Sequence, residues 1–433
     1  MKTRMLRKLL ILCAPLYAAA ALPVAPTSWA QDGNLGPAFR VDAVGSSGIG
    51  SLVDSARDAA GNSVIVWQRI DANAPGIYAR AYDASGVALS PEIKLALTDG
   101  WPSVAMLPGG RYVVSCSSYD DAMRRYHIQA QQYALDGTAV SGVIEVASYA
   151  RTGNLVAYAA APVASDAAGN FVVVWNHASA TQIGSSMATV FGGFSTNNLD
   201  ARRYGSDGVA KGAAFRAGSD LPDLSPLGLY GNSVPVLAMN ASGAFVVAWS
   251  SNGLYRNTIE YQRFDAAGRA LGLKRQANPN ADAQPYAPAV AIDDAGDFVI
   301  GWALAEGAPG AAAHVGVQRF AADGKPQASP LNAYASSGDY GIRGVTLGMQ
   351  PGGEIIVGWS KNSLAGDAAV EAQRYDVAGV AADNRIAVAA LSEGYLMTPA
   401  VAIDGNGDFV LAWAQNPMRS GDFGVYARLY RGP

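Results

Sequence analysis

Four stretches of the chain share one pattern, an aspartate-led turn followed by an apolar run that ends in tryptophan: DAAGNSVIVW (58–67), DAAGNFVVVW (166–175), DDAGDFVIGW (293–302) and DGNGDFVLAW (404–413). The glycine at the fourth position suits a tight turn that needs a positive φ. The run after the turn is rich in β-branched and aromatic residues and is apolar on both sides, which is typical of a strand buried on both faces. Each stretch therefore predicts a turn that leads into a buried β-strand.

The same pattern, with variations, recurs seven times along the chain. The turn glycines are Gly61, Gly110, Gly169, Gly243, Gly296, Gly353 and Gly407. Six residues after each glycine comes an anchor residue: Trp67, Cys116, Trp175, Trp249, Trp302, Trp359 and Trp413. The anchors recur about every 58 residues, and a second half-unit ends at Tyr82, Tyr133, Tyr204, Phe264, Phe320, Tyr375 and Tyr430. A fixed period of this length indicates a repeat architecture.

Each unit predicts four antiparallel strands, because a second turn of the D-x-x-G type and an alternating segment follow the half-unit. Four-stranded units that are apolar on both faces stack radially, so we predict an all-β, seven-bladed β-propeller. An open β-solenoid is the alternative. The last unit stops before its fourth strand, and Gly33–Gly36 resembles the Gly268–Gly272 stretch that leads into that strand elsewhere. We therefore expect residues 33–44 to pair near 425–430 and to close the ring, which would remove exposed edges.

The unit D-x-x-G-x-F-V-V-x-W … Q-R-[FY]-D-x-x-G resembles the propeller repeat of proteins that bacteria secrete, over nearly all of 33–433. The resemblance implies the architecture and says little about function, since such proteins are mostly binding proteins or uncharacterised. The chain lacks the S-x-D-x-G-x-T-W box of sialidase-like propellers, the W-D pattern and a quinone-cofactor blade motif. None of those activities is carried over to this chain.

The beginning of the chain predicts export. Lys2, Arg4, Arg7 and Lys8 precede an apolar stretch at 9–22, and small residues at 28 and 30 suit cleavage after Ala30. We expect a signal peptide at 1–30 and a single propeller domain at 31–433. The mature protein is then expected to be periplasmic or secreted. A membrane anchor at the same stretch and a lipoprotein through Cys13 are weaker alternatives. No later segment is long and apolar enough to span a membrane, and Cys116 then has no partner for an intramolecular disulfide.

Composition narrows the possible partners. Half of the 433 residues are hydrophobic and 15% are charged, which excludes disorder as the main state. The net charge of −4 becomes −8 without the four basic residues of the first eight, so we expect no nucleic-acid partner. The three histidines lie far apart in the sequence, and we predict neither a metal site nor a cofactor.

The candidate site follows from the connections between strands. In an antiparallel blade the second and fourth connections share one face, and all the variation in connection length falls there, as at 147–161, 176–198 and 217–234. On that face an aromatic precedes the inner strand of each blade after the first, and acids often lie close by. We predict ligand-binding residues around the central channel: Trp101, Tyr158, Tyr230, Tyr286, Tyr340 and Tyr395, with the acids Asp99, Asp339 and Glu393.

Other features have plainer interpretations. Two loops are second choices for a site. The charged segment 117–127 has surface ion pairs as its alternative interpretation. The segment 176–198 carries apolar residues, and a hairpin that packs on its own blade is the alternative there. The calcium-like segment 404–408 is better interpreted as a turn. The tryptophan anchors and a glutamine/arginine column repeat in every blade, which indicates packing and hydrogen bonding between blades; the column is Arg80, Gln131, Arg202, Gln262, Gln318, Gln373 and Arg428.

Two functions fit these patterns. Aromatic surfaces beside carboxylates suit sugars or cationic peptide groups, so we favour a binding protein for a glycan, a peptide or a partner protein. The structural alternative is that these aromatics plug the channel and cap the strand ends. A carboxylate-based polysaccharide hydrolase or lyase on the same face is the second function, and it requires carboxylates that converge.

Overall fold

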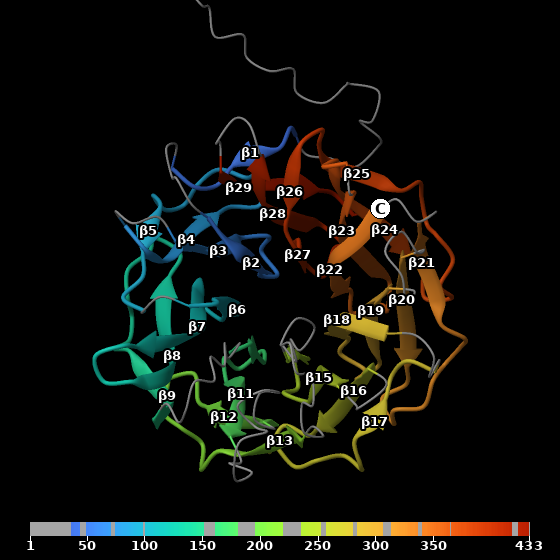
Figure 1. Cartoon of the computed structure of the whole chain (residues 1–433). Helices are drawn as coiled ribbons and strands as arrows, with labels where there is room; N and C mark the ends of the chain where they lie inside the picture. Colours follow the sequence, from blue (N-terminus) through green and yellow to red (C-terminus); the bar gives the residue numbers. More distant parts are fainter. Residues whose placement is uncertain are drawn as a thin grey trace, which may run out of the picture.

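A computed structural model describes residues 36–43, 49–70, 74–97, 100–150, 161–180, 195–219, 235–252, 257–279, 284–305, 313–336, 340–363, 365–417 and 423–432. Within these ranges every regular element is a β-strand. The strands form seven antiparallel blades arranged around a centre (Figure 1). The predicted seven-bladed β-propeller is confirmed, and the open solenoid is wrong. No helix in the described part of the chain is long and apolar enough to cross a membrane.

Four strands in chain order build each of the first six blades, and the first of the four lies nearest the centre (Figure 1). Blade 1 contains β2 (Ile49–Arg57), β3 (Ser63–Arg69), β4 (Gly76–Tyr82) and β5 (Ile93–Lys94). Blade 2 contains β6 (Ser103–Leu107), β7 (Arg111–Asp120), β8 (Arg125–Ala134) and β9 (Ile144–Ala150). Blade 3 contains β10 (Val163–Ser165), β11 (Phe171–Ala180), β12 (Ser195–Tyr204) and β13 (Phe215–Ser219).

Blade 4 repeats this order with β14 (Val236–Met239), β15 (Phe245–Asn252), β16 (Asn257–Phe264) and β17 (Arg275–Gln276). Blade 5 contains β18 (Gln284–Ile292), β19 (Phe298–Ala305), β20 (Ala313–Phe320) and β21 (Leu331–Ala335). Blade 6 contains β22 (Tyr340–Met349), β23 (Ile355–Ser363), β24 (Ala368–Tyr375) and β25 (Ile386–Leu391). Blade 7 is different because its inner strand is in two pieces and its outer strand comes from the beginning of the chain. It contains β26 (Gly394–Leu396), β27 (Ala400–Ile403), β28 (Phe409–Pro417), β29 (Gly424–Tyr430) and β1 (Phe39–Arg40).

The N-terminal segment closes the ring as predicted. In β1, Phe39 lies opposite Ala427 on β29, and the next pair continues the antiparallel register. The buried carboxylate of Asp42 then accepts a hydrogen bond from the backbone N–H of Val425 at 2.8 Å. The last blade thus gains an outer strand from residues that lie almost 400 positions away in sequence, and its edge is covered.

The register of this closing segment matches that of the other blades. The Arg428 Nε donates to the Gly36 carbonyl oxygen at 3.2 Å. In blade 4 the corresponding Gln262 Nε2 donates to the carbonyl of Gly272 at 3.1 Å. Gly36 therefore takes the place that Gly272 has in a continuous blade, which is the correspondence that the glycine pattern predicts.

The anchors fill the spaces between blades. All seven are buried, and each belongs to a hydrophobic cluster that includes residues of the preceding blade. Trp249 of β15, for example, packs with Val172 and Leu199 of blade 3. Its ring also lies so close to Gly218 of β13 that a Cβ there would come within 2.9 Å of it. The predicted role of the anchors in packing between blades is confirmed.

The glutamine/arginine column has a different role from the predicted one. In five blades its side chain donates to a carbonyl ten residues later in the same blade, and so fixes the link to the outer strand: Gln131 to Ser141, Arg202 to Gly212, Gln262 to Gly272, Gln318 to Ala328 and Gln373 to Asp383. Two members of the column lie beside the closing segment and bond to it instead. Arg80 donates to the Val41 carbonyl, and Arg428 donates to the Gly36 carbonyl. The column thus bonds mainly within blades, because its side chains point along the sheet toward the outer strand.

The residue after this column makes the bonds between blades. Its side chain donates to a backbone carbonyl of the next blade: Gln132 to Ser206, Arg203 to Ala267, Arg263 to Ala322, Arg319 to Gly353 and Asp376, and Arg374 to Arg431. Ala81 and Leu429 stand at this position in blades 1 and 7. At the junction of blades 7 and 1, beside Leu429, a buried ion pair between Arg57 Nε and Asp404 Oδ2, 2.9 Å apart, joins the blades instead. At the junction of blades 1 and 2, beside Ala81, the Ser103 hydroxyl donates to the Asp54 carboxylate.

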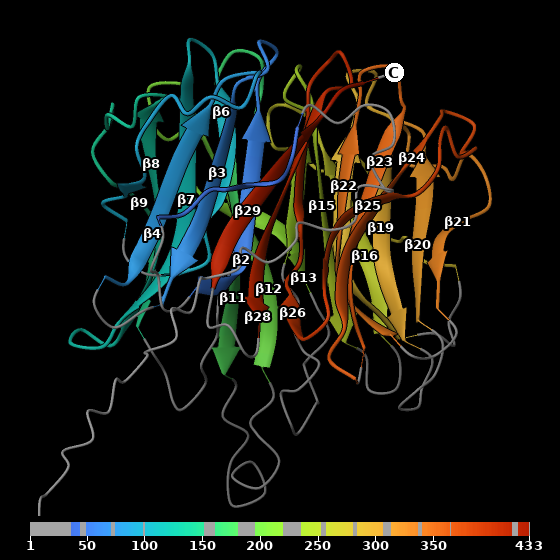
Figure 2. The same ribbon diagram turned by 90° about the horizontal axis from the view of Figure 1, so that it is seen from above.

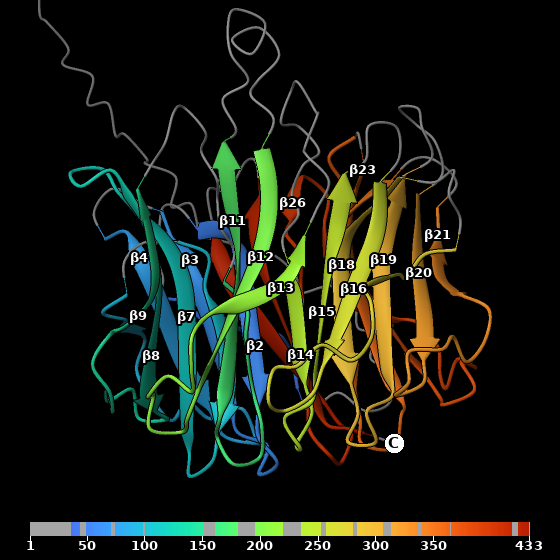
Figure 3. The same ribbon diagram turned by 90° about the horizontal axis from the view of Figure 1, so that it is seen from below.

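The two ends of the ring differ. One end, which we call the turn face, carries the D-x-x-G turns; Figures 2 and 3 show the strands running between this end and the other. In the blade 3 turn, Gly169 N–H donates to the Asp166 carbonyl, and the Asp166 carboxylate accepts the N–H groups of Ala168 and Asn170. The segment 404–408 forms the same turn, with its aspartate also bonded to Arg57, so its interpretation as a turn holds. The opposite end is the loop face.

Candidate functional site

The structure describes part of the predicted ring of ligand-binding residues. Trp101, Tyr286, Glu393 and Tyr395 lie in described segments and are all partly exposed. Tyr340 begins β22, but its side chain is not described. Four further candidates lie outside the described residues and stay predictions: Asp99, Tyr158, Tyr230 and Asp339.

The inner strands of blades 5 to 7 are irregular near the loop face. The pairing of β18 with β19 shifts register between Tyr286 and Ala289, and that of β22 with β23 shifts between Ile342 and Gly344. In blade 7 the inner strand is interrupted between β26 and β27, which both pair with β28. The sequence pattern placed the aromatics of these blades just before the inner strands. In the structure they lie within those strands. Bulges of this kind redirect side chains and often lie beside functional sites.

Tyr286 connects the first two of these irregular strands. Its hydroxyl donates to the carbonyl oxygen of Ile342 at 2.7 Å, across the junction of blades 5 and 6. Burial raises the pKa of Tyr286 to about 12, against the opposing effect of the nearby positive charge of Arg343. The next residue, Ala287, has a φ of 48°, which is uncommon for a residue with a side chain. Tyr286 is therefore a neutral hydrogen-bond donor that supports the bulge in β22.

The bulge in β22 presents Arg343, which the sequence reasoning missed. Its side chain is exposed, and its guanidinium carbon lies 5.8 Å from the centroid of the Tyr395 ring. The Nε donates to the buried Asn362 side-chain oxygen at 3.1 Å, in the amide orientation that also lets Asn362 donate to the Lys361 carbonyl. Gly344 is required beside it, because a Cβ there would collide with Thr398 of blade 7.

A signal for this arrangement exists in the sequence. Gly341 and Gly344 flank Ile342 and Arg343 inside a predicted strand. Glycine within a strand often marks a bulge or a close approach of another segment. An arginine between two such glycines could have been recognised as a residue turned out of the sheet.

The predicted acids do not form a described carboxylate cluster. Glu393 comes directly before β26, two residues before Tyr395 in the sequence. Among the described residues, no group of three or more His, Cys, Asp or Glu side chains is arranged to hold a metal. Trp101 lies before β6, where the preceding Gly100 packs tightly against the backbone of Ser117.

Another inner-strand carboxylate, Asp54 of β2, was not predicted. It accepts hydrogen bonds from the Ser103 hydroxyl at 2.8 Å and from the Val104 N–H at 2.9 Å, both in blade 2. Burial raises the pKa of Asp54 above its ordinary value, against the effect of these donors. One carboxylate oxygen, Oδ2, accepts both of these bonds and joins blade 1 to blade 2, while Oδ1 accepts the N–H of Ser55 at 2.8 Å. Both oxygens are thus occupied, so we assign Asp54 a structural role.

The charged segment 117–127 forms the end of the β7–β8 hairpin. The Nδ1 of His127 lies 2.8 Å from a carboxylate oxygen of Glu145, and Arg125 Nε donates to the Ser148 hydroxyl. Both partners belong to β9, the outer strand, so these groups face away from the centre of the ring. Surface ion pairing is the interpretation that fits this segment. Residues 181–194 of the other second-choice loop, 176–198, lie outside the described residues, so a site or a packed hairpin there stays a prediction.

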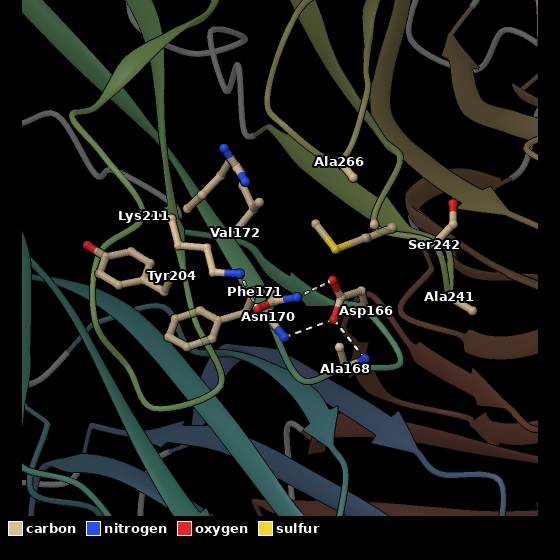
Figure 4. Close-up of a pocket in the computed structure, with 13 residues that line it drawn as sticks. Asp166, Ala168, Asn170, Phe171, Val172, Tyr204, Lys211, Ala241, Ser242 and Ala266 are labelled. Atoms are coloured by element: carbon tan, nitrogen blue, oxygen red, sulfur yellow. Dashed lines mark hydrogen bonds between the residues drawn. The ribbon is translucent and has the colours of Figure 1, made fainter.

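A small cleft of about 350 Å³ lies on the turn face, between blades 3 and 4 (Figure 4). Its apolar wall includes Phe171 and Tyr204, whose rings stack with centroids 4.9 Å apart. Its polar groups bind one another: Lys211 Nζ donates to the Asn170 side chain at 2.6 Å, and Asn170 donates to Asp166 at 2.7 Å. Because these groups are already paired, the cleft offers a ligand little beyond shape.

No protein-family model and no curated protein matches this chain. Solved structures do resemble it. One is an ulvan lyase, described as a new family of polysaccharide lyase and bound to a glucuronate–sulfated rhamnose repeat: TM-score 0.54, 9% identity, covering 91% of this chain and 96% of that chain. Another is a protein of unknown function from Dyadobacter fermentans: TM-score 0.51, 11% identity, covering 77% and 94%. At these identities the likeness shows the propeller fold alone.

Proposed function

We propose that the protein is an exported glycan-binding propeller whose ligand lies at the loop-face end of the ring centre. The observation that carries the proposal is the arrangement of Tyr286, Arg343 and Tyr395 on the inner strands of blades 5 to 7. Aromatic rings offer flat apolar surfaces to sugar rings, and a few fixed polar groups orient the hydroxyls. These residues stand on strands, so they are held in place before a ligand arrives.

The structural comparison supports a sugar ligand. The ulvan lyase matches nearly the whole chain, and its structure contains a bound oligosaccharide. An architecture of this kind can thus accommodate a polysaccharide. Because a fold hosts many functions, this support is weaker than that from the residues themselves.

A carboxylate-based polysaccharide hydrolase or lyase is the alternative on the same face. Glycoside hydrolysis ordinarily needs two carboxyl groups on either side of the scissile bond. In the described part of the loop face, Glu393 is the acid nearest to Tyr395 in sequence, and Asp54 is occupied in joining blades. We therefore favour binding without turnover.

The test is a glycan-array screen of residues 31–433, followed by titration of the best ligand with wild type and Tyr395→Ala. Truncating a rigid aromatic at a contact often costs more than about 1 kcal/mol, so the variant should bind several-fold more weakly. Val377→Ala, an exposed change on the turn face, is the control and should bind like wild type. A screen in which no glycan binds, or a ligand indifferent to Tyr395, would contradict the proposal.

Incubation of the best polysaccharide ligand with the protein separates the two functions. Binding alone predicts an unchanged chain length after prolonged incubation. New reducing ends would indicate a hydrolase, and unsaturated products that absorb ultraviolet light would indicate a lyase.

A further inference from the structure

We infer that this site selects acidic glycans, and that Arg343 binds the carboxylate or sulfate group of the sugar. The inference rests on the proposed function and adds the chemical class of the ligand. It depends on three observations: how Arg343 is presented, what remains free on its guanidinium, and what surrounds it.

The backbone and one buried amide hold Arg343 in place. Arg343 is the extra residue of the bulge, where β22 shifts its pairing with β23, so its side chain leaves the regular alternation of the strand. The buried Asn362 accepts the Nε–H at 3.1 Å, which fixes one side of the guanidinium. Tyr286 supports the same bulge through the carbonyl of Ile342. The arginine is thereby oriented without the help of an acid.

The outer edge of the guanidinium is available. An arginine has five N–H donors, and Asn362 occupies only the one on Nε. Within the described residues, no Asp or Glu lies within ion-pair distance of Arg343, although its side chain is exposed. The two terminal nitrogens therefore present a planar fork of donors, which matches the oxygens of a carboxylate or a sulfate.

Framework arginines of the same protein provide the contrast. Arg319 donates from both terminal nitrogens to carbonyls of the next blade, at 2.7 and 2.8 Å. Arg57 is buried against two aspartates. Both guanidinium groups thus make contacts that join neighbouring blades. Arg343 instead uses only its inner nitrogen, in a bond to Asn362 of its own blade, although the chain carries a net negative charge that would supply acidic partners.

The surroundings favour a charged sugar over a free anion. The ring of Tyr395 lies beside the guanidinium, with 5.8 Å between its centroid and the guanidinium carbon, and Tyr286 is close enough for Arg343 to affect its pKa. A uronic acid or a sulfated sugar combines an anionic group with a ring that packs on aromatic side chains. Both ligand types share the same recognised chemistry, which is an anionic oxygen group on a pyranose.

The experiment uses pairs of oligosaccharides that differ only in charge. One pair is oligogalacturonate and its methyl ester, and the other is a sulfated galactan oligosaccharide and its desulfated form. Each is titrated into residues 31–433 as wild type, Arg343→Gln and Arg343→Lys, together with the best acidic ligand from the array. Arg269→Gln is the matched control, because Arg269 is an exposed arginine on the turn face and its loss changes the net charge equally.

We expect the charged member of at least one pair, or an acidic ligand from the array, to bind better than neutral glycans. Arg343→Gln should lose about ten-fold in affinity for it, the usual range for a charge-assisted hydrogen bond, and Arg343→Lys should lose less. Added salt should weaken wild type more than Arg343→Gln. Arg269→Gln should behave as wild type in binding and in melting. The Arg343 variants lose the bond to the buried Asn362 oxygen, so their binding is measured well below their melting temperatures.

The outcomes separate this inference from the proposed function. If the best ligands are neutral, or if acidic ligands bind Arg343→Gln as well as wild type, the selection of acidic glycans is wrong while glycan binding stands. If no glycan on the array binds, both fail. Which pair responds distinguishes a uronate from a sulfate ester.

Discussion

The turn face and the loop face of this propeller are built from the same strands but follow different rules. On the turn face each blade repeats a D-x-x-G turn, and side chains such as Arg319 and Arg374 donate to carbonyls of the next blade. On the loop face the inner strands of blades 5 to 7 depart from regular pairing, and Arg343 has donors that no described acid takes up. Regularity thus identifies the framework, and the proposed ligand site lies where the inner strands of blades 5 to 7 depart from it.

The largest expected effect tests the closing segment of the framework. A protein that starts at residue 46 loses β1, the Asp42 bond to Val425 and the Gly36 carbonyl that Arg428 uses. Blade 7 would keep an exposed edge on β29, so aggregation or a large fall in melting temperature should result. Thermal unfolding and light scattering measure both. A protein that starts at residue 33 is the control and should behave as the mature chain; equal melting of the two would refute the role of the closing segment.

Trp249→Ala tests the packing between blades. The change removes a fully buried aromatic from the junction of blades 3 and 4, and we expect a loss of about 3–5 kcal/mol in the free energy of unfolding. Denaturant titration measures the loss. Glycan binding should persist at low temperature, since the residue lies away from the loop-face aromatics. Loss of ligand with unchanged stability would place Trp249 in a binding site instead.

Trp101→Ala makes the corresponding test on the loop face. Trp101 is partly exposed at the start of blade 2, so its truncation should cost less stability than Trp249→Ala. It should weaken the best glycan several-fold, since truncating an aromatic at a contact often costs more than about 1 kcal/mol. Paired melting curves and binding titrations of the two variants give the ranking. The reverse ranking would mean that Trp101 is a packing residue.

The smallest effect concerns pH. Burial raises the pKa of Asp54 above 3.8, so wild type should lose stability relative to Asp54→Asn as pH rises from 3.8 through that raised pKa. Asp83 on the turn face has a lowered pKa, chiefly because the Ser85 hydroxyl donates to its carboxylate. The pH trend is therefore the opposite one. Wild type should lose stability relative to Asp83→Asn as pH falls from 3.8 through that lowered pKa.

Unfolding free energies of the three proteins across this pH range measure both trends. Differences that do not change with pH, or that change in the same direction for both variants, would contradict the assignment of Asp54 as a desolvated inner-strand acid.

The sequence predicted the framework in detail and the site in part. Seven turn glycines and their anchors predicted the blade count, and the Gly33–Gly36 pattern predicted that residues 33–44 pair near 425–430; the structure supplied the register. The glutamine/arginine column was assigned to contacts between blades, although most of its bonds lie within them. Repetition shows that a side chain is structural but does not show which carbonyl it reaches. Arg343 was missed because it has no counterpart in the other blades.

The sequence by itself determined which residues are buried, where the chain turns and how many times the unit repeats, because burial and turn geometry depend on local residue patterns that recur in every blade. Only the tertiary structure decided which side chains meet at the loop face. Tyr286, Arg343 and Tyr395 come from three blades and are separated by more than fifty residues at each step. Their proximity depends on two bulges, on one interrupted strand and on how neighbouring blades pack. Gly341 and Gly344 signal one of the bulges, but the pattern of a single blade does not show which side chains of other blades it will meet.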